Sequence, residues 1–182
     1  MLNYLLSNLA NLPIDQHYIV VSEHYDIVQN YLEKTNMNNV SVVRGLGWET
    51  GGDLSIALQE IGIDDDIVVM NGDIITDVNL QELYKNHLRV EAPVSMVLFE
   101  LNDEGEAKRF GQIRFEDEGS ISEFLEKNAK IKRKSNLVDI GFYIFDKKFL
   151  QNNESYLVPK KFKLEIDLFP DFAKRHMLFE NL

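Results

Sequence analysis

Residues 67–87 read IVVMNGDIITDVNLQELYKNH, and this stretch decides the fold. Its first four residues are apolar and lie between an Asp-Asp-Asp run at residues 64–66 and an Asn-Gly-Asp turn at residues 71–73. A short apolar run between turn signals is typical of a strand buried on both faces. Asn79, with Glu82 three residues later, forms a capping pair for a following helix. The stretch therefore predicts a buried strand, a Gly-Asp turn and a helix.

The composition is that of an acidic globular protein. Hydrophobic residues make up 45% and charged residues 27% of the 182 positions, which suits one domain with a sizeable core. The net charge of −11 argues against nucleic-acid binding, which needs a basic surface. The chain has no cysteine, so disulfides, thiolate catalysis and cysteine-ligated metals are excluded. No apolar run reaches the length of a membrane span and no basic region precedes an apolar N-terminal core, so we expect a cytoplasmic protein without a membrane partner.

Strands and helices alternate through the first half of the chain. Such an alternation implies βαβ units and a mostly parallel sheet. The pattern predicts an α/β, Rossmann-like fold with a mostly parallel mixed sheet flanked by helices. The expected strands are residues 18–21, 40–43 and 67–70, and the expected helices are residues 1–12, residues 25–34, the segment after Gly52 and the segment after Asn79.

After Pro93 the pattern changes to short strands with few helices between them. A helix is predicted at residues 164–175, with a break or kink at Pro170. No clear linker separates this part from the first, so we expect a second lobe of a single domain spanning residues 1–182. The expected strands are residues 94–101, 111–115, 121–125 and 138–145.

Asp73 is the first candidate site residue, because the strand at residues 67–70 delivers it to a turn at its carboxyl end. Ligands bind at that end of the strands in open α/β sheets. One or two carboxylates, completed by substrate phosphate and water, suit Mg²⁺. The alternative is that Asp73 only caps a turn. The acidic run at residues 64–66 lies at the opposite end of the strand, and we interpret it as a solvated turn.

Two further groups are candidates. Thr50, Gly51 and Gly52 precede a helix, where threonine caps and glycines let a ligand approach unpaired N–H groups; a flexible entry turn is the alternative. Glu126 and Lys127 follow a strand and suit a sugar hydroxyl and a phosphate; an exposed ion pair is the alternative.

Two other features are given structural interpretations. The basic cluster at residues 130–134 either steers an anionic substrate or is a solvated loop. His87 falls near a helix end, where it is predicted to cap carbonyls. The four histidines have no metal-ligand spacing, and no nucleophile elbow or P-loop pattern is present. Nucleophilic catalysis therefore has no support.

Taken in order, six segments resemble the sugar-phosphate nucleotidylyltransferases, also called nucleotide-sugar pyrophosphorylases. Each segment alone is weak evidence, but six in the right order are strong evidence. The resemblance covers nearly the whole chain. The segments are MLNYLLSNLANLPIDQHYIVVSEHYDIVQNYL, WETGGDLSIAL, VVMNGDIITDVNLQELYKNH, RFGQI, ISEFLEKN and SNLVDIGFYIFDKKFL.

The resemblance implies a nucleotidyltransferase fold, a reaction and a set of site residues. In the implied reaction a sugar 1-phosphate attacks the α-phosphorus of an NTP in line, giving NDP-sugar and pyrophosphate. The protein positions the reactants, and metal and cations offset the developing charge. The implied residues are Asp73 for Mg²⁺, with Gly72 in the same turn, Lys127 for the sugar phosphate, Thr50, Gly51 and Gly52 for the base, and Gly111, Glu126 and Gly141 for the sugar.

The chain departs from the family pattern at both ends. The family begins with a strand and a glycine-rich, cationic loop that holds the triphosphate, and a later metal-binding Asp would fall beyond Leu182. We therefore expect a domain truncated at both ends. The family's first strand lies between those matched by residues 18–21 and 67–70, so these strands either pair directly or a partner or upstream residues fill the gap. On this ground we expect a homo-oligomer.

Glu49 and Asn128 also differ from the family pattern, where a small residue and a proline are common. Three functions remain open. The first is the nucleotidylyltransferase reaction itself. The second is a non-catalytic module that binds or senses a nucleotide sugar. The third, ranked lowest, is a glycosyltransferase, which usually needs an Asp-x-Asp motif where this chain has Asn-Gly-Asp.

Overall fold

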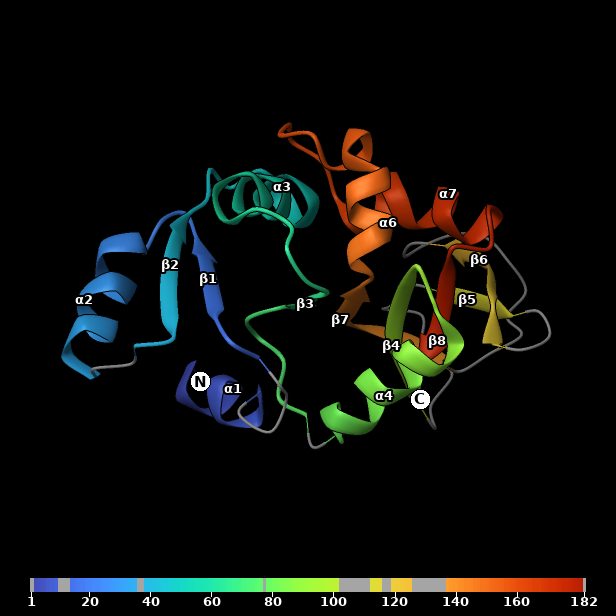
Figure 1. Cartoon of the computed structure of the whole chain (residues 1–182), viewed down its shortest axis with the longest axis horizontal. Helices are drawn as coiled ribbons and strands as arrows, with labels where there is room; N and C mark the ends of the chain where they lie inside the picture. Colours follow the sequence, from blue (N-terminus) through green and yellow to red (C-terminus); the bar gives the residue numbers. More distant parts are fainter. Residues whose placement is uncertain are drawn as a thin grey trace.

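The computed structural model of the chain describes residues 2–9, 14–35, 38–76, 78–101, 112–115, 119–125 and 137–181. Its N-terminal part is a small layer of two parallel strands with three helices, of which the last leads on to the next strand (Figure 1). These elements are α1 (Leu2–Leu9), β1 (His17–Val21), α2 (Tyr25–Thr35), β2 (Val40–Arg44) and α3 (Glu49–Ile61).

The remainder of the described chain is built around a four-stranded sheet and a small hairpin (Figure 1). Its strands are β3 (Ile67–Met70), β4 (Val94–Glu100), β5 (Gln112–Phe115), β6 (Ile121–Leu125), β7 (Leu137–Phe145) and β8 (Leu178–Asn181). Its helices are α4 (Leu80–Val90), α6 (Lys147–Asn152), the short η2 (Glu154–Leu157) and η3 (Leu164–Leu168), and α7 (Phe169–Lys174).

The main sheet is mixed because β7 lies at its centre. The strand order is β3-β7-β4-β8, with β7 antiparallel to both β3 and β4, and with β8 parallel to β4. The α/β fold and the mixed sheet are confirmed, whereas the predicted predominance of parallel pairing is not. Local periodicity cannot reveal that a strand about 70 residues further along the chain enters beside β3 in the opposite direction.

The sheet does not continue from β3 to β1. Within the described residues, β1 pairs only with β2, and β3 pairs only with β7. Direct pairing of the two strands, one of the two arrangements that the sequence left open, is therefore not what the chain adopts.

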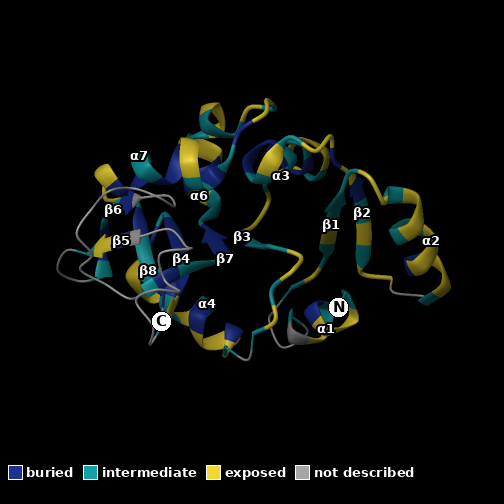
Figure 2. Cartoon of the chain, turned by 180° about the vertical axis from the view of Figure 1, so that it is seen from behind, coloured by how far each residue is buried: buried dark blue, intermediate teal, exposed yellow. Residues whose placement is uncertain are grey.

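The larger of two core clusters packs between one face of the main sheet and the segment of η3 and α7, and the smaller one packs between the other face and α4. Figure 2 shows both β7 and β4 as largely buried. Phe169 is fully buried in the larger cluster, and its ring contacts those of Tyr143 and Phe124 with centroid distances of 4.7 Å and 5.7 Å. Edge-to-face contacts of this kind stabilise a core beyond the area they bury. Pro170 stands in the first turn of α7, where its missing N–H costs nothing, so the predicted break at this residue is confirmed.

The decisive stretch forms the elements that its pattern predicts, with one difference in burial. Asn79 caps α4, and its side chain accepts a hydrogen bond from the N–H of Glu82. All four residues of β3 are only partly buried, although the sequence predicted full burial. The reason is that one edge of β3 faces a cavity instead of another strand.

His87 does not cap helix carbonyls, so that prediction is wrong. Its ring is buried between α4 and β4, and its Nδ1 lies 2.8 Å from the hydroxyl oxygen of Ser95. The carbonyls at the helix end are instead bound by the backbone N–H groups of Glu91 and Ala92. In the part of the chain that the structure describes, no helix is both long and apolar enough to cross a membrane.

Candidate functional site

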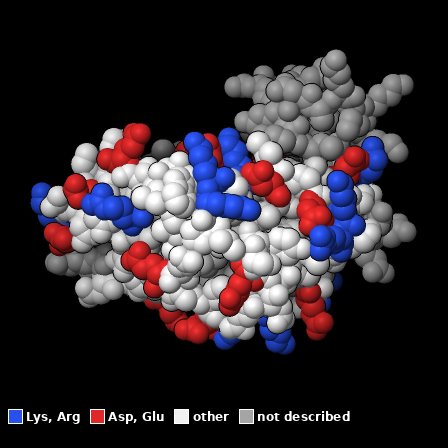
Figure 3. All heavy atoms as spheres, turned by 90° about the horizontal axis from the view of Figure 1, so that it is seen from above, with Lys and Arg blue, Asp and Glu red and all other residues white. Residues whose placement is uncertain are grey.

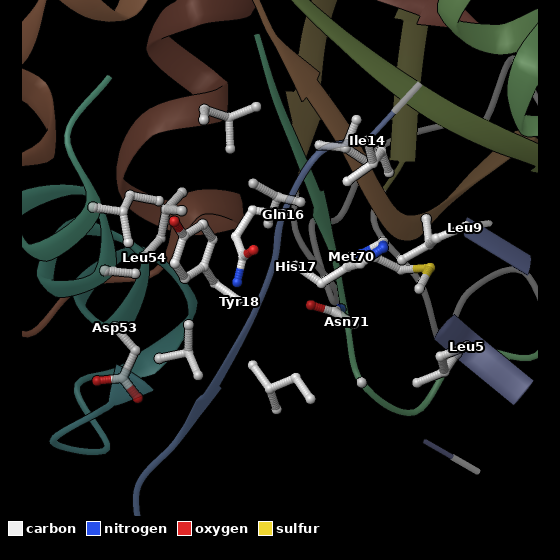
Figure 4. Close-up of a pocket in the computed structure, with 18 of the residues that line it drawn as sticks. Leu5, Leu9, Ile14, Gln16, His17, Tyr18, Asp53, Leu54, Met70 and Asn71 are labelled. Carbon is white, nitrogen blue, oxygen red and sulfur yellow. The ribbon is translucent and has the colours of Figure 1, made fainter. Parts of the chain in front are cut away.

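A cavity of about 420 Å³ lies between the layer of β1 and β2 and the four-stranded sheet (Figure 4). The open edges of β1 and β3 form two of its walls, and α1 and α3 contribute the others. Most of the lining is aliphatic, since each of these elements turns its apolar residues inward. Its polar lining residues are Gln16, His17, Tyr18, Thr50, Asp53, Asp66 and Asn71.

The carboxyl end of β3 forms one rim of this cavity. Asn71 and Gly72 line the cavity, and Asp73 follows them as an exposed residue in the turn. The surroundings are open, because a Cβ added to Gly72 would meet no atom within 4 Å. The structure thus places Asp73 where the sequence predicted it, at the carboxyl end of a strand.

A chain of polar contacts runs beneath this rim. The Thr50 hydroxyl donates to Glu165 Oε2 over 2.7 Å and accepts the N–H of Leu164 over 3.1 Å. The Tyr143 hydroxyl donates to Asp139 Oδ2 over 2.7 Å and lies 3.4 Å from Glu165 Oε1. Residues 115 positions apart are therefore joined in one network.

The network places two carboxylates around one buried phenol. Burial raises the pKa of Tyr143, and the negative charges of Asp139 and Glu165 raise it further. Its hydroxyl therefore stays protonated and acts as a donor at neutral pH. Because that hydroxyl has a single proton and lies as far as 3.4 Å from Glu165 Oε1, the Glu165 carboxylate is suited to accept a hydroxyl group of a ligand.

Gly141 closes the network at the rim. Its φ of +75° is unfavourable for other residues, and its N–H donates to Asp139 Oδ1 over 2.7 Å. The Asn71 side chain packs against it, since an added Cβ would lie 2.1 Å from Asn71 Nδ2. The Asn71 N–H also donates to the Gly141 carbonyl. Gly141 thus lies next to the predicted Gly-Asp turn.

Gly51 and Gly52 allow another segment of the same chain to approach the backbone of α3 closely. The N–H groups of both donate to the Phe162 carbonyl over 3.1 Å. A Cβ on Gly51 would lie 2.2 Å from the Phe162 ring, and one on Gly52 would lie 2.5 Å from the Lys160 carbonyl oxygen. The expectation that these N–H groups are unpaired is therefore wrong.

Thr50 does not cap α3, which is a second correction. The helix begins at Glu49, so Thr50 lies inside its first turn, and the helix has no side-chain cap. The hydroxyl of Thr50 is instead used in the contacts with Glu165 and Leu164. It still lines the cavity, opposite the end of β3.

Comparison with known protein families gives a match over nearly the whole chain. Residues 1–179 match the family model described as "Nucleotidyl transferase". The chain belongs to the nucleotidyl transferase family. The family that the sequence resemblance predicted is confirmed.

Two curated relatives of this nucleotidyl transferase have names that specify a sugar phosphate. A putative mannose-1-phosphate guanyltransferase of Sulfolobus acidocaldarius is 24% identical over 164 residues, which are 89% of this chain and 44% of that protein. A glucose-1-phosphate adenylyltransferase of Geobacillus stearothermophilus is 30% identical over 173 residues, covering 83% of this chain and 44% of that protein. The chain spans less than half the length of these relatives.

Solved structures share the fold of this nucleotidyl transferase. HddC from Yersinia pseudotuberculosis has a TM-score of 0.75 at 20% identity, and the match covers 98% of this chain and 74% of that one. A putative glucose-1-phosphate thymidylyltransferase from Bacillus anthracis has a TM-score of 0.73 at 21% identity, covering 98% of this chain and 72% of that one.

The predicted site residues of the nucleotidyl transferase thus divide into three groups. Thr50, Gly72 and Gly141 lie at or beside the rim, with Asp73 in its turn. Gly51 and Gly52 are buried against the segment that contains Phe162. Three predicted residues, Gly111, Glu126 and Lys127, lie outside the described residues, as does the basic cluster at residues 130–134.

Three network residues were missed by sequence reasoning. Asp139 and Tyr143 share a face of β7 with Gly141, because alternate residues of a strand point the same way. An acidic residue two positions before a glycine in an otherwise apolar strand is a usable signal. Glu165 offered none, since its place in the site depends on how η3 packs on α3.

The acidic run at residues 64–66 is not simply a solvated turn, which corrects its interpretation. Asp66 accepts hydrogen bonds from the Tyr84 hydroxyl and from the N–H of Lys147, and the Lys147 ammonium binds the Asp64 carbonyl. The run therefore ties the start of β3 to α4 and α6. Among the described residues, no three His, Asp or Glu side chains gather as a metal site here or elsewhere.

Acidic and basic side chains alternate on the face over α3, α6 and α7 (Figure 3). No broad region of one sign is visible among the described residues on that face. A mixed surface on a chain with net charge −11 does not attract the phosphate backbone of nucleic acids.

Proposed function

We propose that the chain acts in the transfer of a nucleotidyl group from an NTP to a sugar 1-phosphate, giving NDP-sugar and pyrophosphate. The observation that carries the proposal is the polar rim at the carboxyl end of β3. Asn71 packs there against Gly141, which is joined to the Thr50–Glu165–Tyr143–Asp139 network, and Gly72 and the exposed Asp73 follow Asn71 in the turn. This is the end of an α/β sheet where ligands bind. The chain belongs to the nucleotidyl transferase family.

Asp73 fits Mg²⁺ as a single protein carboxylate in open surroundings. This ion keeps several waters and is commonly bound by one or two carboxylates plus substrate phosphates, so a dedicated cage of protein ligands is not needed. Bound there, it would supply charge stabilisation at the phosphoryl oxygens. The role that we assign to the Asp73 side chain is to hold this ion.

The other residues act by positioning. The Tyr143 hydroxyl makes a long contact of 3.4 Å with Glu165 Oε1, so we assign Glu165 to a hydroxyl group of the sugar or ribose. Thr50 holds Glu165 in place, and Tyr143 stays neutral and holds Asp139. Catalysis of phosphoryl-type transfer consists almost entirely of positioning the reactants and stabilising their charge.

The remaining roles are carried over from the family resemblance. We propose that Gly111 and Glu126 bind the sugar and that Lys127 meets its phosphate. Gly51 and Gly52 serve the base pocket indirectly, because they seat the Phe162 segment against α3 and so fix where Thr50 lies. We propose that the reaction takes place in the cytoplasm.

A second candidate function is binding of a nucleotide sugar without turnover. One observation favours it: among the described residues that line the cavity there is no lysine or arginine, and there are two aspartates. A triphosphate and a leaving pyrophosphate need cations to offset their charge, whereas an NDP-sugar carries less charge.

Calorimetric titration of the chain with ADP-, GDP-, UDP- and dTDP-sugars, with and without Mg²⁺, tests both candidates. We expect saturable binding of one member, tightened about tenfold by Mg²⁺. In Asp73→Asn this tightening should vanish. In the matched control Asp65→Asn, at the opposite end of β3, it should persist, because that side chain is used only to accept the N–H of Asp66.

Release of pyrophosphate from the matching NTP and sugar 1-phosphate then separates the two functions. Turnover that disappears in Asp73→Asn supports the transferase. Binding of the NDP-sugar without pyrophosphate release supports the binding module. No binding by any member of the panel contradicts both.

A further inference from the structure

We propose that a second cavity, on another face of α3 from the candidate site, binds an uncharged sugar and thereby holds the first turn of α3 in place. The cavity measures about 530 Å³ and lies between the C-terminal half of α3 and the segment of α6 and η2. Figure 1 shows α3 and α6 next to each other. Sites for small molecules commonly have volumes of roughly 300 to 1,000 Å³. The proposal goes beyond the proposed reaction and does not rest on it.

One face of α3 forms the first wall of this cavity. Ser55, Leu58 and Gln59 of the helix line it together with Gly62, the residue that follows the helix. Their spacing of three and four residues places them on one side of the helix. A different side of α3 lines the cavity of the candidate site, and Leu58 contributes to both. The helix therefore separates two cavities.

The two walls of the second cavity are joined at both of its ends. At one end, the side-chain amide of Gln151 in α6 donates to the Ile63 carbonyl over 2.8 Å. At the other end, the N–H groups of Gly51 and Gly52 donate to the Phe162 carbonyl. These contacts flank the part of α3 that lines the cavity. The fold therefore forms the cavity in advance, which lowers the cost of ordering it around a ligand.

The lining combines buried apolar residues with exposed polar ones. Leu58 and Leu150 are buried, whereas Gln59, Glu154 and Ser155 are exposed at the mouth of the cavity. Within the described residues, none of these three polar side chains has a hydrogen bond or an ion pair. An amide and a hydroxyl both donate and accept, and a carboxylate accepts. The mouth thus offers donors and acceptors above an aliphatic floor.

The charges and rings of the lining select the class of ligand. Among the described residues that line the cavity there is no lysine, arginine, histidine or aromatic residue, and Glu154 adds one negative charge. A phosphate finds no cation there, and a nucleobase finds no ring on which to stack. A simple amine uses the carboxylate but leaves the amide and hydroxyl groups unpaired. Sugar hydroxyls both donate and accept, and a sugar's C–H groups pack on aliphatic side chains.

A ligand in this cavity contacts both α3 and η2, which gives it an effect on the first turn of α3. From η2 the chain runs through Val158 to Phe162, whose carbonyl binds the N–H groups of Gly51 and Gly52. If this segment leaves α3, the cavity loses one of its walls. The sugar therefore binds the closed arrangement, and a ligand that binds one state stabilises that state by mass action.

Two-dimensional NMR of the intact chain tests the site. The probes are D-glucose, D-mannose and D-galactose, and the comparison ligands are the 6-phosphates of the same sugars. We expect at least one uncharged sugar to shift the side-chain amide signals of Gln59 and Gln151 in a saturable way. Its 6-phosphate should bind about tenfold more weakly, because Glu154 repels the phosphate. No saturable shift with any of the three sugars, or equal binding of the phosphate, overturns the proposal.

Neighbouring residues of α3 supply matched variants. Gln59→Ala removes a lining amide, whereas Glu60→Ala changes an exposed residue that lines neither cavity. We expect the first to weaken sugar binding about fivefold and the second to leave it unchanged. Ser155→Phe fills the mouth and should abolish the saturable shift with an unchanged circular dichroism spectrum. Should one variant not fold, the other decides, and parent-like binding in both overturns the proposal.

Amide hydrogen exchange tests the effect on α3. At a sugar concentration of about ten times its Kd, we expect the amides of Gly51 and Gly52 to exchange about tenfold more slowly. The same sugar should leave their exchange unchanged in Ser155→Phe. Saturable binding without slower exchange of these two amides would overturn the inferred effect on α3.

Discussion

The four-stranded sheet around β7 and the layer of β1 and β2 differ in how far their strands are covered by neighbours. In the sheet around β7, residues 142–145 are all buried (Figure 2). The ring of Phe169 in α7 packs against Tyr143 of this sheet. In the layer of β1 and β2, only Val43 is buried, and Tyr18 is 42% exposed. The strands have similar apolar sequences, so composition does not explain the difference. What differs is whether each strand has neighbours on both edges and both faces.

The two regions are expected to contribute differently to the free energy of unfolding and to binding. Buried apolar area is the main source of stability, so the closed sheet supplies most of the free energy of unfolding. Within the described residues, the layer of β1 and β2 has a strand edge without a strand partner, and an apolar cavity adjoins it. The polar rim lies where the two meet, with β3 held by the closed sheet and Thr50 carried on α3.

The largest expected effect comes from truncating matched leucines in the two regions. Leu178 is fully buried in β8, whereas Leu6 is partly buried on a wall of the cavity. We expect Leu178→Ala to lower the free energy of unfolding by about 2 to 5 kcal/mol, because it leaves a cavity in a packed core. Leu6→Ala should lower it by about 1 kcal/mol or less. Urea unfolding followed by circular dichroism measures both, and equal losses would contradict the comparison.

Two glycines offer the next test. A Cβ on Gly52 would lie 2.5 Å from the Lys160 carbonyl oxygen and 2.6 Å from Trp48 Cβ, whereas one on Gly72 would meet nothing within 4 Å. We expect Gly52→Ala to cost about 1 to 3 kcal/mol, because the backbone must shift. Gly72→Ala should stay within about 0.5 kcal/mol of the parent. Thermal unfolding of both variants measures the two costs. A stabilised Gly52→Ala would show that the Lys160 carbonyl does not pack against Gly52.

Removing single hydroxyls should give smaller effects. Tyr143→Phe leaves Asp139 Oδ2 without its 2.7 Å donor, and we expect a loss of about 1 to 2 kcal/mol. Tyr18→Phe in the open layer should change the free energy of unfolding by less than about 0.5 kcal/mol, because that residue is exposed. Chemical denaturation measures both. A neutral Tyr143→Phe would mean that the network is already satisfied by solvent.

The smallest expected effect is a pH dependence. Burial lowers the pKa of His87 below 6.5, so the unfolded chain binds more protons between that lowered pKa and 6.5. The stabilising contribution is fully present above pH 6.5 and is lost as pH falls through the lowered pKa. His87→Gln should flatten the pH dependence of unfolding in this window. His17→Gln should flatten it less, because burial also lowers the pKa of His17 but its side chain is only partly buried. A larger change from His17 would contradict this ranking.

Local sequence patterns predicted most strands and helices of both regions, but not which strands pair or how far each strand is covered. The strands at β1, β2, β3 and β7 and the cap of α4 follow from apolar runs and one Asn-x-x-Glu pair, which are local features. β8 was missed, because its sequence LFEN is short and half polar. The order β3-β7-β4-β8 joins segments far apart in the sequence, and periodicity within a segment has no information on its partner.

For the candidate site too, some residues could be singled out from the sequence, whereas others depend on contacts between distant segments. Asp73 was singled out from the local signature of its turn, and Gly141 from the family resemblance alone; the structure places both at or beside the rim. Glu165 could not be singled out, since only packing of η3 on α3 brings it to Thr50. The glycines at residues 51–52 were singled out correctly as sites of close approach, but the approaching group is the chain's own Phe162 segment.

The seating of the Phe162 segment on α3 has a consequence for synthesis on the ribosome. The first turn of α3 depends on a carbonyl and a carboxylate that lie more than a hundred residues later in the chain. At a translation rate of about 5 to 20 residues per second, Thr50 leaves the ribosome roughly 6 to 23 s before Glu165. During that interval the buried glycines of α3 have no cover, and glycine is a weak helix former. We therefore expect α3 to be among the last helices to settle, and the nascent open layer to be the part of the chain that chaperones meet first.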